Sequence, residues 1–335
     1  MYKYLREVVK HFEAYEVKEM DYDIKLDANE GINRADGLNR YPVDRSDELR
    51  AKLAQTLGRE PEELLIGNGS SELIELAMKA YLEAGETVVS IAPTFSMYKV
   101  FTLIHKGVYA EYPLAGMEKL DREGFIEFVK TSGAKLVILC NPNNPTGSLI
   151  PREDLLAIVA RVDAMVVLDE AYVEFSDDSL ADATRQFKNL VVLRSFSKAR
   201  ALAGIRLGYM IGDKEIIGYI NRVRSPYNVN RLTQAVGLQA LEEAAATKAD
   251  IAMIKAERTR MKGELEKLGF SPLESHANFL FFPGRPGLGD KLASRGILIR
   301  GFGGPLSGYY RLTMGTPAEN DAVLKAIREV QNERS

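Results

Sequence analysis

The sequence contains few of the residues that a metal site or a disulfide-bonded protein would need. Its 335 residues include one cysteine and three histidines. A single cysteine excludes an internal disulfide framework, and we interpret Cys140, which lies in an apolar run, as a small buried side chain. Because His11, His105 and His276 lack the spacing of metal ligands, we expect no metal.

Long apolar runs and blocks of like charge are missing as well. No stretch approaches the ~18 apolar residues of a membrane span, and no secretory signal opens the sequence. The net charge is only −3, with neither a basic block nor an acidic tail. We therefore expect a cytoplasmic protein that binds neither nucleic acid nor membranes.

Short apolar runs alternate with helical segments over the first two thirds of the chain. The composition, 46% hydrophobic and 27% charged, is that of a globular protein with one or two domains. This alternation predicts an α/β fold with a mostly parallel sheet that helices cover. The expected strands are residues 64–66, 87–91, 108–112, 136–140, 165–169, 190–194 and 207–211. The expected helices are residues 46–57, 71–84, 121–131 and 151–162, with a turn and helix at residues 93–105.

The pattern changes near residue 231. Ala, Leu, Glu and Lys dominate residues 231–267, which predicts one or two long helices. We predict three parts: an N-terminal segment (1–30) that packs with the small domain, a large α/β domain (31–230) and a small α+β domain (231–335). In the small domain we expect strands at residues 279–282, 297–300 and 309–314 and helices at 287–295 and 317–333.

Lys198 has the most informative surroundings. It follows the predicted strand 190–194, with Ser195 three residues before it and Arg206 eight residues after it. Partial desolvation beyond a strand end favours the neutral amine, which can attack a carbonyl carbon. Ser195 and Arg206 can together hold a phosphate. An amine that attacks an aldehyde beside a phosphate site is what pyridoxal phosphate (PLP) requires.

Two more groups of polar side chains follow predicted strands. Residues 141–147 come after strand 136–140, and Asp169 and Tyr172 lie at and just beyond the end of strand 165–169. In an open α/β sheet, ligands bind outside the carboxyl ends of the strands. We therefore expect these residues to share one crevice with Lys198.

Each of these side chains has a simpler interpretation beside the chemical one. Asp169 can pair with the pyridine nitrogen of PLP and keep it protonated, or it can cap a turn. Tyr172 and Asn144 can hydrogen-bond the phenolic oxygen of the ring. Alternatively, Tyr172 is an ordinary half-buried tyrosine and Asn144 a turn residue.

The remaining candidates have the same two kinds of interpretation. Ser70 and Ser71 can open a helix whose N-terminus attracts a phosphate, or they can be ordinary caps. Phe95 can stack on a pyridine ring or pack in the core. Arg311 and Arg300, in predicted strands, can clamp a carboxylate or lie solvated at an edge. Taken together, polar residues at successive strand ends favour a PLP enzyme.

These motifs resemble a known family over residues 25–320, the PLP-dependent aminotransferases of fold type I. The shared motifs are Asn-Pro-x-Asn-Pro-Thr-Gly at residues 141–147, Asp-x-Ala-Tyr at 169–172 and Ser-x-x-Lys at 195–198, followed by Arg206. Within the family, the sequence is most similar to the histidinol-phosphate aminotransferases, and residues 26–30, 39–42, 67–70, 199, 202–206, 226–230, 277–279 and 310–313 carry that likeness.

The resemblance implies a role for each candidate cofactor residue. Lys198 would form a Schiff base with PLP, and Asp169 would bind the ring nitrogen. Tyr41 would reach the phosphate of the neighbouring subunit's cofactor, which implies an obligate homodimer; its position before the sheet otherwise indicates only an exposed side chain. The phenolic oxygen would be bound by Asn144 and Tyr172, the phosphate by Ser70, Ser71, Ser195 and Arg206, and the ring face by Phe95.

The resemblance also implies the reaction. L-histidinol phosphate and 2-oxoglutarate would be interconverted with imidazole-acetol phosphate and L-glutamate in histidine biosynthesis, by a ping-pong reaction through Lys198. Arg311 and Arg300 would hold the substrate carboxylate or phosphate, and Tyr15 and Asn144 would line the substrate site.

The sequence departs from the family pattern at four places. Arg200 and Ala201 stand where Phe-Gly is usual, Phe95 where we expect tyrosine, Ala14 where we expect proline, and residues 31–33 where Asn-Pro is usual. None of the four touches cofactor chemistry, so they bear on the substrate. An aromatic amino-acid aminotransferase, a decarboxylase of the threonine-phosphate type and a non-catalytic PLP-binding regulator remain alternatives.

Overall fold

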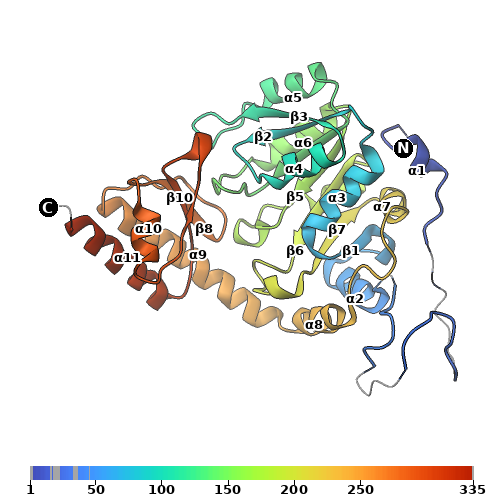
Figure 1. The fold of residues 1–335 in the computed structure, drawn as a ribbon. Coiled ribbons are helices and arrows are strands. Elements are labelled where there is room, and N and C mark those ends of the chain that lie inside the picture. The colour runs from blue at the N-terminus through green and yellow to red at the C-terminus, as the bar shows by residue number, and fades with distance from the viewer. Residues whose placement is uncertain (1–2, 16, 18–22, 33–36, 45, 334–335) are drawn as a thin grey trace.

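A large mixed sheet forms the centre of the molecule (Figure 1). The computed structural model describes residues 3–15, 17, 23–32, 37–44 and 46–333. The sheet has seven strands in the order β1-β7-β6-β5-β4-β2-β3, and β7 alone runs against its neighbours. The predicted α/β fold is therefore confirmed. The strands are β1 (Leu64–Gly67), β2 (Thr87–Ala92), β3 (Val108–Pro113), β4 (Leu136–Cys140), β5 (Met165–Asp169), β6 (Leu190–Ser195) and β7 (Gly208–Gly212).

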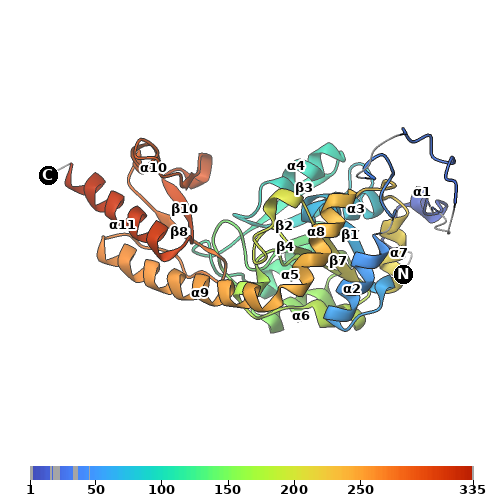
Figure 2. The ribbon, with the colours of Figure 1, turned by 90° about the horizontal axis from the view of Figure 1, so that it is seen from below.

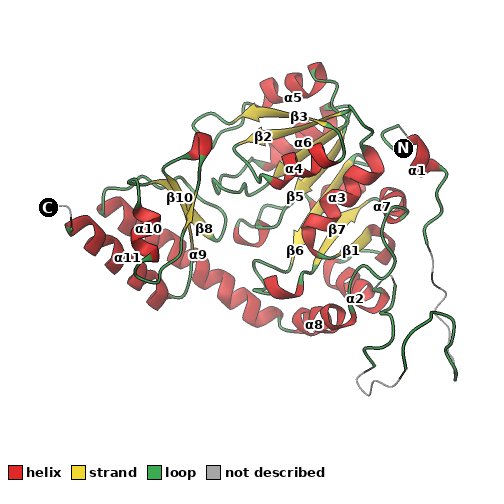
Figure 3. Ribbon diagram, viewed as in Figure 1, coloured by secondary structure: helices red, strands yellow, loops and turns green. Residues whose placement is uncertain are grey.

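Helices cover both faces of this sheet (Figure 3). Alternate residues of the central strands enter two separate cores: Val137 and Leu139 lie in one, Leu136 and Ile138 in the other. This alternation is the two-residue period of a strand buried on both faces. The first core takes α2 (Asp47–Leu57), α5 (Arg122–Thr131), α6 (Arg152–Arg161) and α8 (Arg231–Glu242), and the second takes α3 (Gly69–Tyr81), α4 (Met97–Ile104) and α7 (Lys214–Asn221).

A second, three-stranded sheet forms the core of the C-terminal part, in the order β8-β10-β9. Leu265, Phe282 and Ile327 are fully buried where helices pack on it. The long helix α9 runs from α8, beside the large sheet, to this second sheet (Figure 2). The elements are α9 (Ala244–Lys267), β8 (Phe279–Pro283), α10 (Leu288–Ala293), β9 (Arg300–Gly301), β10 (Tyr309–Thr313) and α11 (Pro317–Asn332).

Helix α7 and strand β9 are two elements that differ from the prediction. Helix α7 was not predicted, although Asp213 begins it by accepting a hydrogen bond from the amide of Glu215. Strand β9 has two residues, where four were expected at 297–300. The domain boundaries stay a prediction, and Ala240 and Leu241 of α8 pack in a core of the large sheet. None of the described helices is long and apolar enough to cross a membrane.

The N-terminal residues do not lie where we expected them. Leu5 precedes the short helix α1 (Glu7–Lys10), and Val9 lies within it. Both side chains are buried in the core that α3 and α7 help to form. The Arg6 amide donates to Ala80 O at 3.0 Å, and Arg222 donates to Val9 O at 3.1 Å. Residues 3–10 thus pack with the large sheet because these apolar side chains bury there. Residues 1–2, 16 and 18–22 of the segment lie outside the described residues.

A buried ion pair attaches the segment that precedes α2 to the large sheet. Asp44 and Arg224 have side chains only 3% exposed, with Asp44 Oδ2 2.8 Å from Arg224 Nη2. The backbone amide of Tyr227 donates to Asp44 Oδ1 at 2.8 Å. Because both groups are buried, each one needs the opposite charge of the other to offset the loss of its hydration.

Replacing Asp44 by alanine tests this attachment. Asp44→Ala leaves the Arg224 guanidinium buried without its counter-charge, so we expect the free energy of unfolding to fall by about 3 kcal/mol or more. Urea denaturation of the cofactor-free protein measures the change. Asp182→Ala is the control: its carboxylate is 73% exposed and pairs with Arg152 at the surface. Its loss is expected to be below about 1 kcal/mol, and equal losses in the two variants would contradict the interpretation.

Candidate active site

The ends of four strands meet at one edge of the large sheet. Cys140 at the end of β4 pairs with Asp169 at the end of β5. Ser195 at the end of β6 pairs with Gly208, which in turn pairs with Gly67 at the end of β1. This register brings the three predicted groups of polar residues to the same edge, as ligand sites in open α/β sheets require.

Lys198 lies in the turn after β6 and is partly buried. Its Nζ is 5.3 Å from the centre of the Tyr172 ring. Burial lowers the pKa of Lys198, and the positive charge of Arg311 lowers it further, while Asp169 opposes the shift. A larger fraction of this lysine is therefore the neutral amine than at an exposed position.

Asp169 is 4% exposed and has a donor on each carboxylate oxygen. The Tyr98 hydroxyl donates to Oδ2 at 2.8 Å, and the Ala171 amide donates to Oδ1 at 3.1 Å. Burial raises the pKa of Asp169, and these two hydrogen bonds and Lys198 act against that rise. The carboxylate is thus held in one orientation in a place of low polarity, where a positive ring nitrogen would be its natural partner.

Arg206 lies against the first residues of α3. A Cβ built on Gly69 would be 2.7 Å from Arg206 Nη2, so only glycine allows the guanidinium so close to this helix end. Arg206 Nη1 also donates to Ser197 Oγ at 3.4 Å. Ser70 and Ser71 are in the first turn of α3, whose free amides attract an anion. A guanidinium, hydroxyls and free amides in one place suit a phosphate.

Glycine is also needed on the neighbouring strand. A Cβ on Gly208 would lie 2.7 Å from the amide nitrogen of Ser70. Gly208 pairs with Ser195, whose Oγ accepts from the Ser197 amide at 3.0 Å. The helix end, Ser195 and Arg206 are therefore close neighbours, as the sequence predicted.

Side chains from both sheets meet on the other side of Lys198. Arg311 Nη1, from β10, donates to Asn144 Oδ1, and its guanidinium lies 5.2 Å from the centre of the Phe279 ring. Tyr172, 6% exposed, meets the same ring edge-on at 5.3 Å. Asn144, Tyr172 and Arg311 therefore line one side of the site.

The other predicted residues occupy different places. Phe95 packs edge-on against Tyr98, with the ring centres 5.5 Å apart, and Tyr98 in turn contacts Asp169. Arg300 is exposed and is the cross-strand partner of Arg311. A cluster of His, Cys, Asp or Glu able to hold a metal ion does not occur in the described part of the chain.

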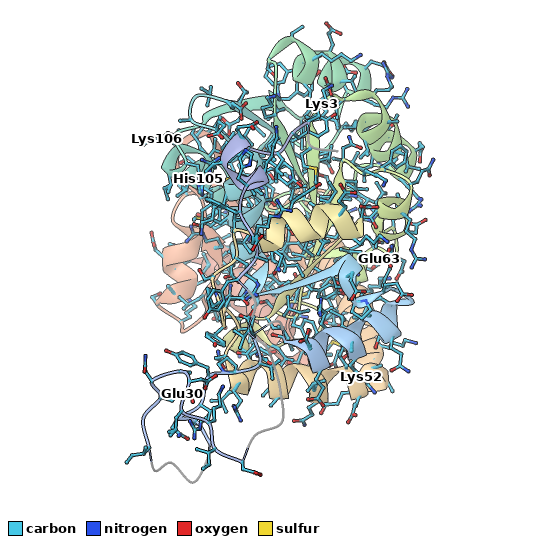
Figure 4. All side chains as sticks on the ribbon, turned by 90° about the vertical axis from the view of Figure 1, so that its right-hand side faces the viewer. Lys3, Glu30, Lys52, Glu63, His105 and Lys106 are labelled. Atoms are coloured by element: carbon cyan, nitrogen blue, oxygen red, sulfur yellow. The ribbon has the colours of Figure 1, made fainter. Side chains whose placement is uncertain are left out.

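Tyr41 and Tyr15 have their neighbours on a different segment, around Tyr227. Tyr41 is 52% exposed and stacks on Tyr227 at 4.5 Å, and its amide donates to Glu30 Oε1 at 2.7 Å. Tyr15 is 58% exposed. Burial raises the pKa of Tyr227, and Tyr15 lies close enough to raise it further. Figure 4 shows Glu30 on a loop that stands out from the body of the molecule.

Tyr98 is the residue that the sequence interpretation missed. It lies three positions after Phe95, within the expected turn and helix at residues 93–105. Helical spacing of this kind predicts that the two side chains share one face of the segment. No motif signals its contact with Asp169, because the two residues are 71 positions apart in the chain. The spacing from Phe95 was the available signal.

The residues at this edge fit PLP: an amine for an aldehyde, a carboxylate for a pyridine nitrogen and an anion site for a phosphate monoester. The fold and the site define the class as an aminotransferase of fold type I. The family model "Aminotransferase class I and II" matches residues 14–327, and the chain belongs to this family.

Its relatives point to one branch of that family. The chain is 37% identical to a histidinol-phosphate aminotransferase of Caldanaerobacter subterraneus subsp. tengcongensis, over 97% of this chain and 98% of the relative. It is also 37% identical to one of Pyrococcus furiosus, over 98% of both chains. The crystal structure of the Sinorhizobium meliloti histidinol-phosphate aminotransferase in complex with pyridoxal-5'-phosphate matches with a TM-score of 0.84 and 29% identity, over 90% of this chain and 85% of that one.

The departure at Ala201 leads to a first prediction for the site. Ala201 has φ of 53°, a left-handed conformation that costs a residue with a Cβ about 1–2 kcal/mol. Ala201→Gly removes that strain and adds the chain entropy of glycine, so we expect a net stabilisation of about 0.5–1 kcal/mol. Urea denaturation measures it. Ala203→Gly, on the next turn of backbone, is the control and should destabilise, since Ala203 has no positive φ.

The raised pKa of Asp169 leads to a second prediction, on the cofactor-free protein. The folded state binds the proton more tightly than the unfolded state, whose carboxyl has its ordinary pKa of 3.8. The contribution of this carboxyl to stability is therefore largest below pH 3.8, and it is lost as pH rises from there through the folded-state pKa. We expect Asp169→Asn to be more stable than the wild type at neutral pH, with a difference that shrinks as the solution is acidified. Denaturation midpoints across pH measure this, and a difference independent of pH would refute it.

Proposed function

We propose that this chain is a PLP-dependent histidinol-phosphate aminotransferase of histidine biosynthesis. It would interconvert L-histidinol phosphate and 2-oxoglutarate with imidazole-acetol phosphate and L-glutamate. The observation that carries the proposal is the partly buried Lys198, with its lowered pKa, between Asp169 and Tyr172 at a strand edge that also holds Arg206. The names of relatives similar over nearly the whole chain support this substrate.

Bound PLP supplies an aldehyde that takes the amino group and a ring that accepts electrons from the substrate carbon. The chain's own residues would do the rest. Lys198 would hold the cofactor and, as a neutral amine, move a proton between the substrate carbon and C4′ of the cofactor. Asp169 would keep the ring nitrogen protonated. Asn144 and Tyr172 would bind the phenolic oxygen, with Phe95 on the ring face, and the phosphate would be bound by Ser70, Ser71, Ser195 and Arg206.

The substrate groups are anionic, and the cations of β9 and β10 suit them. Arg311 and Arg300 are cross-strand neighbours. Because the planar guanidinium binds carboxylates and phosphates alike, this pair could accept both a dicarboxylate and a phosphate monoester. The Asn144 amide, which already accepts a hydrogen bond from Arg311, would lie beside the bound substrate.

A cytoplasmic homodimer is part of the proposal. Tyr41 and Tyr15 are each more than half exposed and lie beside Tyr227, so they would act on the cofactor and substrate of a second copy. Large apolar side chains on the same segment support an interface there, since such surface is rarely left in water. Ile24, Leu26 and Ile32 are 78%, 84% and 80% exposed.

A half-reaction tests the function. The PLP-loaded protein is mixed with L-histidinol phosphate, without 2-oxoglutarate, and its visible spectrum is followed. We expect the band of the lysine-bound cofactor to be replaced by that of pyridoxamine phosphate at least about tenfold faster than with phenylalanine or tyrosine, because those substrates lack the phosphate that Arg311 and Arg300 would bind. Lys198→Met is the control and should give no such conversion.

The other outcomes assign other functions. Rapid conversion by aromatic amino acids alone would indicate an aromatic aminotransferase. Release of carbon dioxide from a phosphorylated amino acid, with no need for 2-oxoglutarate, would indicate a decarboxylase. A spectrum unchanged by every amino donor would exclude an aminotransferase.

A further inference from the structure

We propose that Tyr98 is a positioning residue that fixes the Asp169 carboxylate in place for the ring nitrogen of the cofactor. This inference rests on PLP as the cofactor of the proposed function. Tyr98 would not touch the reacting atoms. It would act through Asp169 alone, and the hydrogen bond between the Tyr98 hydroxyl and Asp169 Oδ2, at 2.8 Å, is the contact that carries the effect.

The two oxygens of Asp169 have different donors, which fixes the plane of the carboxylate. Oδ1 accepts from the Ala171 amide, two residues on in the chain. Oδ2 accepts from Tyr98, which comes from another element, α4. Without Tyr98, the remaining backbone hydrogen bond leaves the carboxylate free to turn about it. A hydrogen bond from a second element therefore supplies an orientation that the strand end alone cannot.

Tyr98 is itself held firmly. Its side chain is fully buried, and the edge of one ring meets the face of the other where it packs with Phe95, at 5.5 Å. The Thr102 hydroxyl donates to Tyr98 O at 2.8 Å, one turn along the helix. The Cys140 thiol lies beside the phenol and is also buried. A rigid donor preorganises its acceptor better than a mobile one does.

The charges around this hydrogen bond favour donation by Tyr98. Burial raises the pKa of Tyr98 well above its usual value, and the negative charge of Asp169 raises it further, so the phenol keeps its proton. The hydrogen bond lowers the pKa of Asp169 against the effect of burial. The titratable groups facing the pair are Lys198, Cys140 and Tyr172, and burial raises the pKa of the last two. Tyr98 thus helps to keep Asp169 ionised.

A second buried tyrosine, on the neighbouring helix α3, provides a matched control. Tyr81 of α3 is 1% exposed, and its hydroxyl has no hydrogen-bond partner among the described residues. Tyr81→Phe and Tyr98→Phe each remove one oxygen atom from a buried ring. Thermal unfolding of the cofactor-free proteins shows whether both variants fold. PLP binding is then compared at a temperature below the unfolding transitions of both variants.

The experiment is a double-mutant cycle read by PLP binding. The dissociation constant of PLP is measured by spectral titration for the wild type, Tyr98→Phe, Asp169→Asn, the double variant and Tyr81→Phe. We expect Tyr98→Phe to raise the constant about tenfold or more, as the loss of a hydrogen bond to a charged group does, and Tyr81→Phe to leave it unchanged. In the Asp169→Asn background, Tyr98→Phe should add little, because the two residues act as a unit.

Turnover gives an independent measurement. If Tyr98 acts through the ring nitrogen, Tyr98→Phe should lower kcat with little change in KM and alter the pH profile of kcat. Equal PLP affinity of Tyr98→Phe and Tyr81→Phe would overturn the proposal, as would full additivity with Asp169→Asn. Since binding of PLP needs no substrate, a wild type that binds PLP but does not react with histidinol phosphate would refute the proposed substrate and leave this comparison intact. A wild type that does not bind PLP would overturn both.

Discussion

The register between β4, β5 and β6 is the constraint on which the site depends. Side chains alternate between the faces of a strand, so a slip by one residue would exchange Asp169 with Glu170. The two acids have separate partners on opposite faces: Asp169 accepts from Tyr98, and Glu170, 1% exposed, pairs with Arg194 at 2.8 Å. Two buried carboxylates with dedicated partners therefore specify one register, and the same register places Lys198 beside Asp169.

The sequence could predict the strands and the polar residues after them because both signals are local. An apolar run followed by Asn, Asp or Ser needs no knowledge of the rest of the chain. The contacts of Tyr98 and of Arg311 could not be predicted, because they depend on how α4 and β10 pack against distant strand ends. Residues 3–10 were misplaced for the same reason, since the hydrophobicity of Leu5 and Val9 says that they are buried but does not say against which domain.

The backbone near Lys198 adopts left-handed conformations at two residues. Ala201 and Arg206 both have positive φ, at 53° and 56°, within a few residues of Lys198. Residues in such conformations persist where the surrounding structure holds them, and they gather at functional sites. The left-handed turn at Arg206 is what brings its guanidinium to Gly69 at the start of α3. The lowered pKa of the lysine is a related demand, because a buried amine loses its hydration.

The length of helix α9 makes the position of the second sheet sensitive to the angle between α8 and α9. A single residue, Glu243, ends α8 and begins this helix of 24 residues, which is about 36 Å long. A tilt of about 5° at Glu243 moves the far end of α9 by about 3 Å, roughly the length of one hydrogen bond. The second sheet packs on that far end, and Arg311 belongs to it. The separation of Arg311 from Asn144 therefore depends on the angle between α8 and α9, and Ile251 and Ile254 help to set that angle where they pack beside Tyr172 and Ala199.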